Sequence, residues 1–449
     1  MNETHLEAIA AELVERATRA GATAADALVR EADEFSTCVR LGKIESLKEA
    51  ESKALGLRVF LGVRSATSFS SDFSPQSLDR LVGRTLAMAR ATSEDSASGL
   101  PEPELLGRHA GDLELFSHDV TELSAEYKID YARRAEQAAL DSDGRIKNSE
   151  GAWFESSWGS KAYANSSGFC GSYRSSYCAV SVAPIAQDGG MQRDYWYSVS
   201  RRASGLEDPE TVGRKAAERA LRKLGARKVS TCRVPVVFDS ETARSLLGHL
   251  FEAVRGDAIY RSASFLAGKL GQRVAGENLT VLDDGLRPGG FGSHPFDDEG
   301  VASSTTSVIE NGVLRNYLLN CYTARKLNLR TTGNAARGIA GPPTVGPKNF
   351  YLVPGTQSPE EIIRSVQSGF YVTELIGFGV NIVTGDYSRG ATGMWIEKGE
   401  LTYPVEEVTI AGNLAEMLNH ISAIGSDLEF RSALASPSLL VEGLTVAGM

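Results

Sequence analysis

The segment LLGHLFEAVRGDA (residues 246–258) carries the residue types that a metal-binding helix uses. His249 and Glu252 are three residues apart, so on a helix their side chains share a face. Zinc peptidases of the H-E-x-x-H type place two imidazoles on one face and use the glutamate as general base. No two of the six histidines have that spacing: His5, His109, His118, His249, His294 and His420. His249 is therefore interpreted as a hydrogen-bonded residue of a buried helix.

Other catalytic motifs are absent or weak. The sequence has neither the G-x-S-x-G nucleophile elbow nor the G-x-x-x-x-G-K-[ST] phosphate loop. GFGVNIVTG (377–385) lacks the strand–helix setting of a dinucleotide site and is interpreted as strand and turn glycines. HPFDDEGV (294–301) is the densest acidic cluster, with Asp297, Asp298 and Glu299. It could bind a hard cation, but a turn with solvated carboxylates is the favoured interpretation.

Composition narrows the function classes. The 449 residues carry a net charge of −10, and the one dense basic stretch (201–228) has acidic residues interleaved at helical spacing. Nucleic acid binding is therefore not expected, because such proteins present a basic face. The five cysteines are an odd number without a C-x-x-C pair, which is typical of reduced thiols. No apolar run reaches membrane-spanning length, and the N-terminus resembles a helix more than a signal peptide, so a cytoplasmic location is predicted.

The elements that must hold these residues fall into two parts. Residues 1–228 are predicted to form an N-terminal α+β domain, in which helix–antiparallel sheet–helix occurs twice, at about 1–92 and 108–228. This order suggests a duplication or two stacked subdomains. Within the first sheet, turns are predicted at Gly42 and near Ser52.

Residues 229–449 are predicted to form a mostly β C-terminal domain with one helix at 241–254. Asn311-Gly312 predicts a type I′ hairpin turn, and a second hairpin is expected around Lys398-Gly399. The Gly- and Pro-rich segment 331–349 is predicted to be a flexible loop without secondary structure of its own. The overall class is α+β.

PFDDEGVASSTTSVIENGVLRNYLLNCYTARKLNLRTTGNA (295–335) resembles the signature region of the TldD/PmbA family, once described as modulators of DNA gyrase and classed as U62-type peptidases. The similarity continues through 270–285 and 405–428 and extends over nearly the whole chain. The resemblance implies two paralogous subunit types. A TldD-type subunit carries a His-Glu-x-x-x-His helix for the catalytic metal, and a PmbA-type subunit, also called TldE, does not. Together they form a heterodimer that degrades unfolded or flexible peptides.

Aligned with that family on Gly256-Asp257 and residues 282–285, the two metal-binding histidines fall on Leu247 and Glu252, and the catalytic glutamate falls on Gly248. A cysteine near the C-terminus, which completes the metal shell in TldD-type chains, is absent from residues 430–449. An intact zinc site is therefore not expected. An apolar stripe keeps the helix as a scaffold: Leu246, Leu250, Ala253 and Val254.

The resemblance implies a non-catalytic, PmbA/TldE-like subunit of a heterodimeric metallopeptidase. It predicts no cofactor in this chain, zinc in a TldD-type partner subunit and a peptide substrate, and it is compatible with a homodimer. The segment 331–349 is predicted to be mobile without substrate, with Asn334 and Arg337 pointing toward a substrate chamber near the 297–299 carboxylates. Two alternatives stay open. One is a peptidase in its own right that uses Glu252, His294 and those carboxylates; the other is a gyrase-associated regulator.

Overall fold

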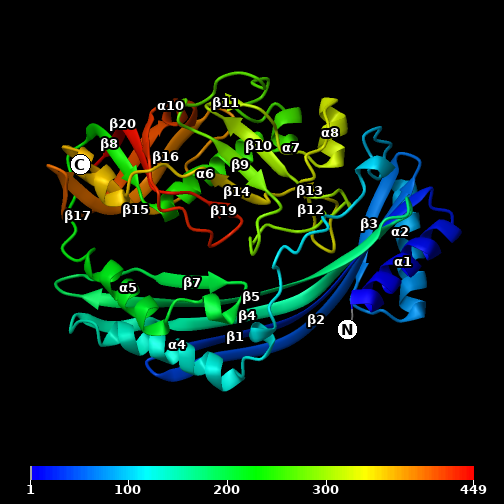
Figure 1. Ribbon diagram of the computed structural model, residues 1–449, viewed down its shortest axis with the longest axis horizontal. Helices are drawn as coiled ribbons and strands as arrows, with labels where there is room; N and C mark the ends of the chain where they lie inside the picture. The colour runs from blue at the N-terminus through cyan, green and yellow to red at the C-terminus, as the bar shows by residue number, and fades with distance from the viewer. Residues whose placement is uncertain (1–2, 449) are drawn as a thin grey trace.

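The computed structural model describes residues 3–448. The N-terminal half is a long curved antiparallel sheet, and the C-terminal half lies over its concave side (Figure 1). The helices of the N-terminal half are α1 (Glu3–Arg19), α2 (Pro75–Ala91), α3 (His118–Thr121), α4 (Ala125–Leu140) and α5 (Pro209–Leu221). Its strands are β1 (Ala24–Arg40), β2 (Lys43–Leu61), β3 (Arg64–Ser70), β4 (Ile146–Asn165), β5 (Cys170–Gln187), β6 (Met191–Arg193) and β7 (Trp196–Ser200).

One continuous sheet joins the two parts of the N-terminal half. The strand order is β3-β2-β1-β4-β5-β6, with β7 also paired to β5. Because β1 pairs with β4 from Asp26↔Asn165 to Val39↔Ala152, the parts expected at 1–92 and 108–228 share a sheet rather than stack as two. Side chains alternate across it, so Ala27 and Val29 pack under α1 and α2, while Asp26 and Leu28 face the C-terminal half.

The C-terminal half is built around a ring of strands with α6 packed against it. Its helices are α6 (Ser240–Val254), α7 (Gly256–Tyr260), α8 (Cys321–Leu327), α9 (Pro359–Ser365) and α10 (Leu414–Asn419). Its strands are β8 (Cys232–Phe238), β9 (Val281–Asp284), β10 (Thr305–Glu310), β11 (Val313–Leu314), β12 (Ala335–Ala336), β13 (Thr344–Val345), β14 (Asn349–Leu352), β15 (Ser368–Ile376), β16 (Asp386–Glu397), β17 (Glu400–Asn413), β18 (Ile421–Ile424), β19 (Leu434–Ala435) and β20 (Leu439–Ala447). The order β17-β16-β15-β8-β20 closes because β17 also pairs with β20. The α+β class predicted from the sequence is confirmed.

Local turn chemistry explains the hairpins. Asn311 and Gly312 both have positive φ (47° and 78°), as a type I′ turn requires, and Lys398-Gly399 does the same (53° and 81°). The turn expected near Ser52 is wrong: β2 runs unbroken from Lys43 to Leu61. Its first half is polar because β3 pairs only with residues 55–61, which leaves 43–53 an exposed sheet edge.

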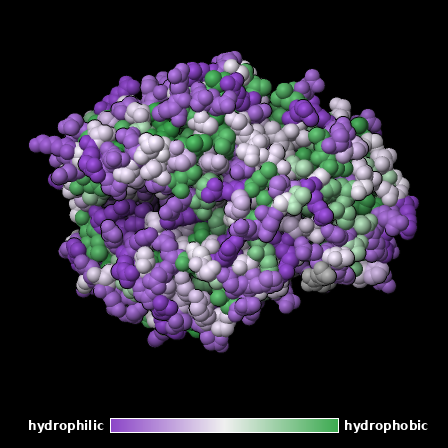
Figure 2. Space-filling view, viewed as in Figure 1, coloured by the Kyte–Doolittle hydropathy of each residue, from purple (hydrophilic) through white to green (hydrophobic). Residues whose placement is uncertain are grey.

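The surface is mixed in polarity and is hollowed between the two halves, at the left of the space-filling view (Figure 2). None of the helices in the described part of the chain has the length and apolar character that a membrane crossing requires.

Candidate functional site

The helix that aligns with the family's metal motif is α6, and its predicted bounds and apolar stripe are confirmed. Asp239 caps it by accepting a hydrogen bond from the N–H of Thr242 at 2.8 Å. Leu246, Leu250 and Val254 are buried in the C-terminal core. The sequence features that predicted this helix are therefore the ones that hold it in place.

The three motif positions present no metal ligand set. Leu247 is only 6% exposed and packs in the core with its apolar neighbours. At Gly248 an added Cβ would meet only Leu434 Cδ1, at 3.8 Å, so this position is open but carries no side chain. The Glu252 carboxylate is bound by Arg255 at 2.8 Å. This set does not fit a zinc ion, which needs three protein ligands of the His, Cys, Asp or Glu type.

His249 lies on the same helix but faces a cation. Its Nε2 is 3.4 Å from Nη1 of Arg389, and its ring meets Tyr387 edge-on. Burial, and then Arg389, lower the pKa of His249, so the imidazole is neutral at physiological pH. Among residues 3–448 no three His, Cys, Asp or Glu side chains are arranged to hold a metal ion.

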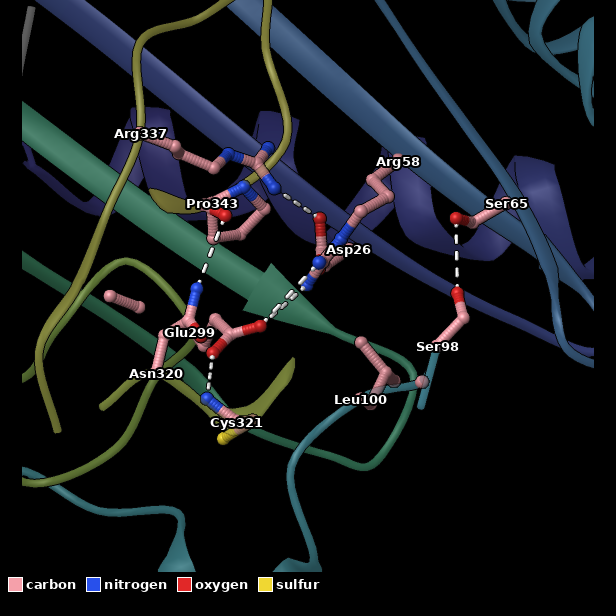
Figure 3. Close-up of polar contacts among 12 residues, drawn as sticks. Asp26, Arg58, Ser65, Ser98, Leu100, Glu299, Asn320, Cys321, Arg337 and Pro343 are labelled. Atoms are coloured by element: carbon pink, nitrogen blue, oxygen red, sulfur yellow. Dashed lines mark hydrogen bonds and ion pairs between the residues drawn. The ribbon is translucent and has the colours of Figure 1, made fainter. Parts of the chain in front are cut away.

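A second group of chemistry-bearing residues joins the two halves of the chain. The interdomain charge cluster consists of Asp26, Arg58, Glu299 and Arg337 (Figure 3). Asp26 and Arg58 are direct cross-strand partners on β1 and β2, and Arg58 Nε donates to Asp26 at 2.8 Å. Arg337 Nη1 donates to the other oxygen of Asp26 at 2.6 Å. Glu299 Oε1 is 3.4 Å from Arg58, while its Oε2 accepts the N–H of Cys321 at 3.0 Å.

The side chains of the cluster are almost fully shielded from solvent, so each charge is stabilised by its neighbours rather than by water. The side chains of Asp26 and Arg337 are both 0% exposed, and that of Arg58 is 8% exposed. Burial opposes ionisation of Asp26, but Arg58 and Arg337 outweigh burial and keep the pKa of Asp26 below its usual value. Two carboxylates and two guanidinium groups balance in charge, as buried ions must.

The acidic turn at 297–299 is buried, so the interpretation as solvated carboxylates is wrong. Asp297 accepts hydrogen bonds from the backbone N–H groups of Glu299, Val301 and Ala335 at 2.9 to 3.0 Å. Burial, with the nearby charge of Glu299, raises the pKa of Asp297 to about 7. These three residues order the chain around them and do not form an open cation site.

Asp298 makes a second buried contact between the halves, since it pairs with Lys161 of β4 and accepts the N–H of Arg337 at 2.8 Å. Burial would raise the pKa of Asp298, but Lys161 outweighs it and lowers the pKa. The acidic turn is thereby tied to the N-terminal sheet.

The segment 331–349 also differs from its prediction, because it contains the short β12–β13 hairpin. Asn334 is 2% exposed and donates to Asp283 Oδ2 at 2.6 Å and to Gly346 O at 3.0 Å. Arg337 belongs to the interdomain charge cluster. Both side chains are bound within the chain, and Arg337 also lines a pocket with residues of β1, β4 and β5. That they face a substrate chamber stays a prediction. The predicted mobility of the segment stays a prediction.

Sequence reasoning missed Asp26, Arg58 and Lys161. A usable signal was present for two of them, because Asp26 and Arg58 each interrupt an apolar run, AADALV and LGLRVFL. A charged residue inside a buried strand needs a partner of opposite charge. The partner's identity depends on strand register, which no local pattern gives.

A cavity of about 360 Å³ opens beside the cluster, between the two halves. Arg58 and Glu299 line it, together with residues of α7, α8 and the linker at 93–99. No residue of α6 lines it, so it is separate from the altered metal motif.

Comparison with known proteins identifies the fold and its relatives. Family models match residues 25–89, 118–224 and 231–448, as domain 1, the central domain and the C-terminal domain of PmbA/TldA metallopeptidases. The chain is 40% identical over 425 residues to the metalloprotease PmbA of Escherichia coli O157:H7, covering 94% of this chain and 92% of that protein. It is 37% identical over 437 residues to a PmbA homologue of Haemophilus influenzae, covering 97% and 94%.

Solved structures are similar over the full length. A proposed modulator of DNA gyrase from Bacteroides thetaiotaomicron superposes with a TM-score of 0.92 at 28% identity, covering 99% of both chains. TldE of Thermococcus kodakarensis superposes with a TM-score of 0.87, covering 98% of this chain and 99% of that one. At 21% identity the latter similarity bears on the fold alone.

Proposed function

The chain belongs to the PmbA/TldD family of metallopeptidases, and on that premise we propose that it is a subunit of a two-chain metallopeptidase without a catalytic metal of its own. A TldD-type paralogue supplies the zinc and the catalytic residues. This chain stabilises that subunit and helps to enclose the unfolded or flexible peptide that is cleaved.

The observation that carries the proposal is the chemistry of the α6 face. A catalytic zinc site needs ligands and a general base that converge on one point. Here Leu247 offers an aliphatic side chain, Gly248 offers none, and the Glu252 carboxylate is bound by Arg255. Three functional positions have lost their chemistry while the helix keeps its cap and its buried face.

The packing of α6 supports a retained structural role. Its apolar face belongs to the same core cluster as β8, β15 and β17 of the strand ring. A helix that had lost its function would still be needed to fill this core, because removing large buried side chains costs roughly 2–5 kcal/mol each.

The test compares this chain, a TldD-type paralogue and their mixture. Zinc is measured by elemental analysis after dialysis, and cleavage is followed on a fluorogenic unfolded peptide. The chain alone should hold no stoichiometric zinc and cleave nothing, while the mixture should co-purify as one complex and cleave.

Two matched substitutions assign the catalytic role. Changing the motif glutamate of the paralogue to glutamine should abolish cleavage by the complex, and Glu252→Gln in this chain should leave the rate unchanged. Near-equimolar zinc in the isolated chain, together with cleavage by that chain, would contradict the proposal.

A further inference from the structure

The cavity beside the interdomain charge cluster has the dimensions of a ligand site. Its volume of about 360 Å³ lies within the range of small-molecule pockets, roughly 300–1,000 Å³. The N-terminal half contributes β3 and the linker at 93–99, and the C-terminal half contributes α7, α8 and the β13 region. Because both halves build the walls, the site exists only in the folded full-length chain.

Two buried polar side chains line this cavity with hydrogen-bonding capacity to spare. Arg58 is 7% exposed and Glu299 is 1% exposed. The shorter hydrogen bonds of Arg58 go to Asp26, whereas Nη1 and Nη2 lie 3.5 and 3.4 Å from Glu299 Oε1. Those distances are at the limit of a hydrogen bond, so Arg58 Nη1 retains donor capacity and Glu299 Oε1 retains acceptor capacity. A donor and an acceptor thus stand side by side (Figure 3).

The remaining walls are mostly apolar and aromatic. Val63, Pro342 and Val345 line the cavity, and the rings of Tyr260 and Tyr322 meet edge-on with centroids 6.1 Å apart. Such walls favour an apolar group in the ligand, because each buried CH₂ contributes about 0.8 kcal/mol.

Four of the five charged side chains on the walls are paired, which argues against an ionic ligand beside them; the fifth, Arg261, is exposed and donates to the Tyr260 hydroxyl at 2.9 Å. Asp95 is bound by Lys326 at 2.8 Å, and Asp257 is bound by Arg255 at 3.1 Å. Glu299 faces Arg58. A charged group placed between Arg58 and Glu299 would lose hydration without gaining an unpaired counter-ion.

We propose that this cavity binds a neutral ligand that carries an amide next to an apolar group. The amide N–H donates to Glu299 Oε1, the amide carbonyl accepts from Arg58 Nη1, and the apolar group contacts the proline, valine and tyrosine walls. This site lies outside the altered metal motif, and binding there requires only this chain and not the partner subunit.

Ligand-observed NMR titration of the full chain tests the proposal with three related leucine derivatives. N-acetyl-L-leucinamide is neutral, N-acetyl-L-leucine is an anion and L-leucinamide is a cation. The neutral probe should bind with a Kd of about 1 mM, given its dozen heavy atoms. Both charged probes should bind at least about tenfold more weakly, in keeping with the lost hydration.

Occluding variants locate the binding. Ser93 of the N-terminal half and Thr344 of the C-terminal half are exposed residues that line the cavity, so Thr344→Trp and Ser93→Trp should each weaken binding at least about tenfold. Thr356→Trp, at an exposed position outside the cavity, is the matched control and should bind as the unmodified chain does. If the circular dichroism spectrum shows that one occluding variant is unfolded, the binding measured for the other variant decides the question.

Three outcomes would overturn the proposal. The first is no saturable binding of the neutral probe at about twenty times the expected Kd. The second is equal binding by a folded occluding variant, and the third is preference for a charged probe. None of these depends on the zinc content or peptidase activity of the two-chain complex, so this proposal and the proposed function fail separately.

Discussion

Replacing Arg337 by methionine should destabilise the chain strongly, although the hydrogen-bond partners of Arg337 are Asp26, Gly56 and Asp298 and none lies on α6. Arg337 and Asp26 have side chains that are both 0% exposed and are joined at 2.6 Å. Removing one partner of a buried ion pair costs roughly 3–5 kcal/mol, because a charge is left without compensation. Arg58 still donates to Asp26 at 2.8 Å, so we expect the lower end, a loss of about 3 kcal/mol in the free energy of unfolding.

The pairing can be separated from the packing by a double-mutant cycle. Asp26→Leu leaves Arg58 and Arg337 near each other with only Glu299 to balance them, so it should cost about 4–5 kcal/mol. The double variant should lose about 2 kcal/mol less than the sum of the two single losses, since it leaves no unpaired charge. Urea unfolding at pH 7, followed by circular dichroism and tryptophan fluorescence, gives these free energies.

An exposed arginine provides the control. Arg134 is paired with Glu210 at 2.7 Å, nearly the same distance, but the two side chains are 46% and 34% exposed. Solvent screens this pair, so Arg134→Met should cost less than about 1 kcal/mol. If Arg337→Met costs no more than Arg134→Met, or if the double-mutant cycle is additive, the argument from buried charge is refuted.

Three further outcomes are expected. Asp297 has a pKa of about 7 in the folded chain and about 4 in the unfolded chain. The protonated carboxyl group therefore stabilises the fold fully below pH 4, and this contribution is lost as the pH rises to 7. Urea unfolding of the unmodified chain should therefore show a fall of about 1.4 kcal/mol per pH unit relative to Asp297→Asn between pH 5 and 7. Gly248→Ala should raise the free energy of unfolding by about 0.5–1 kcal/mol, because its Cβ meets nothing closer than 3.8 Å, whereas Gly213→Ala should lower it by about 1–3 kcal/mol, because its Cβ would lie 2.2 Å from Ala135 O. Incubation with a chelator should leave the melting temperature of the isolated chain unchanged, and a fall of several degrees would contradict the absence of a structural zinc.

Local chemistry allowed much of the fold to be predicted. Asn311-Gly312 and Lys398-Gly399 favour positive φ wherever they occur, so their hairpins follow from sequence neighbours alone. Helix α6 likewise has a cap at Asp239 and an apolar stripe at helical spacing. The altered motif positions, Leu247, Gly248 and Glu252, are identities that folding does not change, so their lack of metal chemistry was also visible in the sequence.

Partners distant along the chain decided what the sequence could not. The polar residues around Ser52 predict a turn, yet they form a strand because β1 pairs with them and their other edge faces water. The acidic turn at 297–299 and the segment 331–349 look solvated by composition. The acidic turn and Arg337 of that segment are buried, where Lys161 and Asp26 meet them from the N-terminal sheet.

The sequence by itself determined the α+β class, the family and the residue types at positions 247, 248 and 252, since each depends on residue identity and on preferences within a few neighbours. Only the tertiary structure decided where the charges lie. Asp26 and Arg337 are 311 residues apart, and a carboxylate becomes buried only when the fold brings a cation to it. A charged group can be buried only together with its partner, and Asp26 and Arg337 meet only after the two halves have packed.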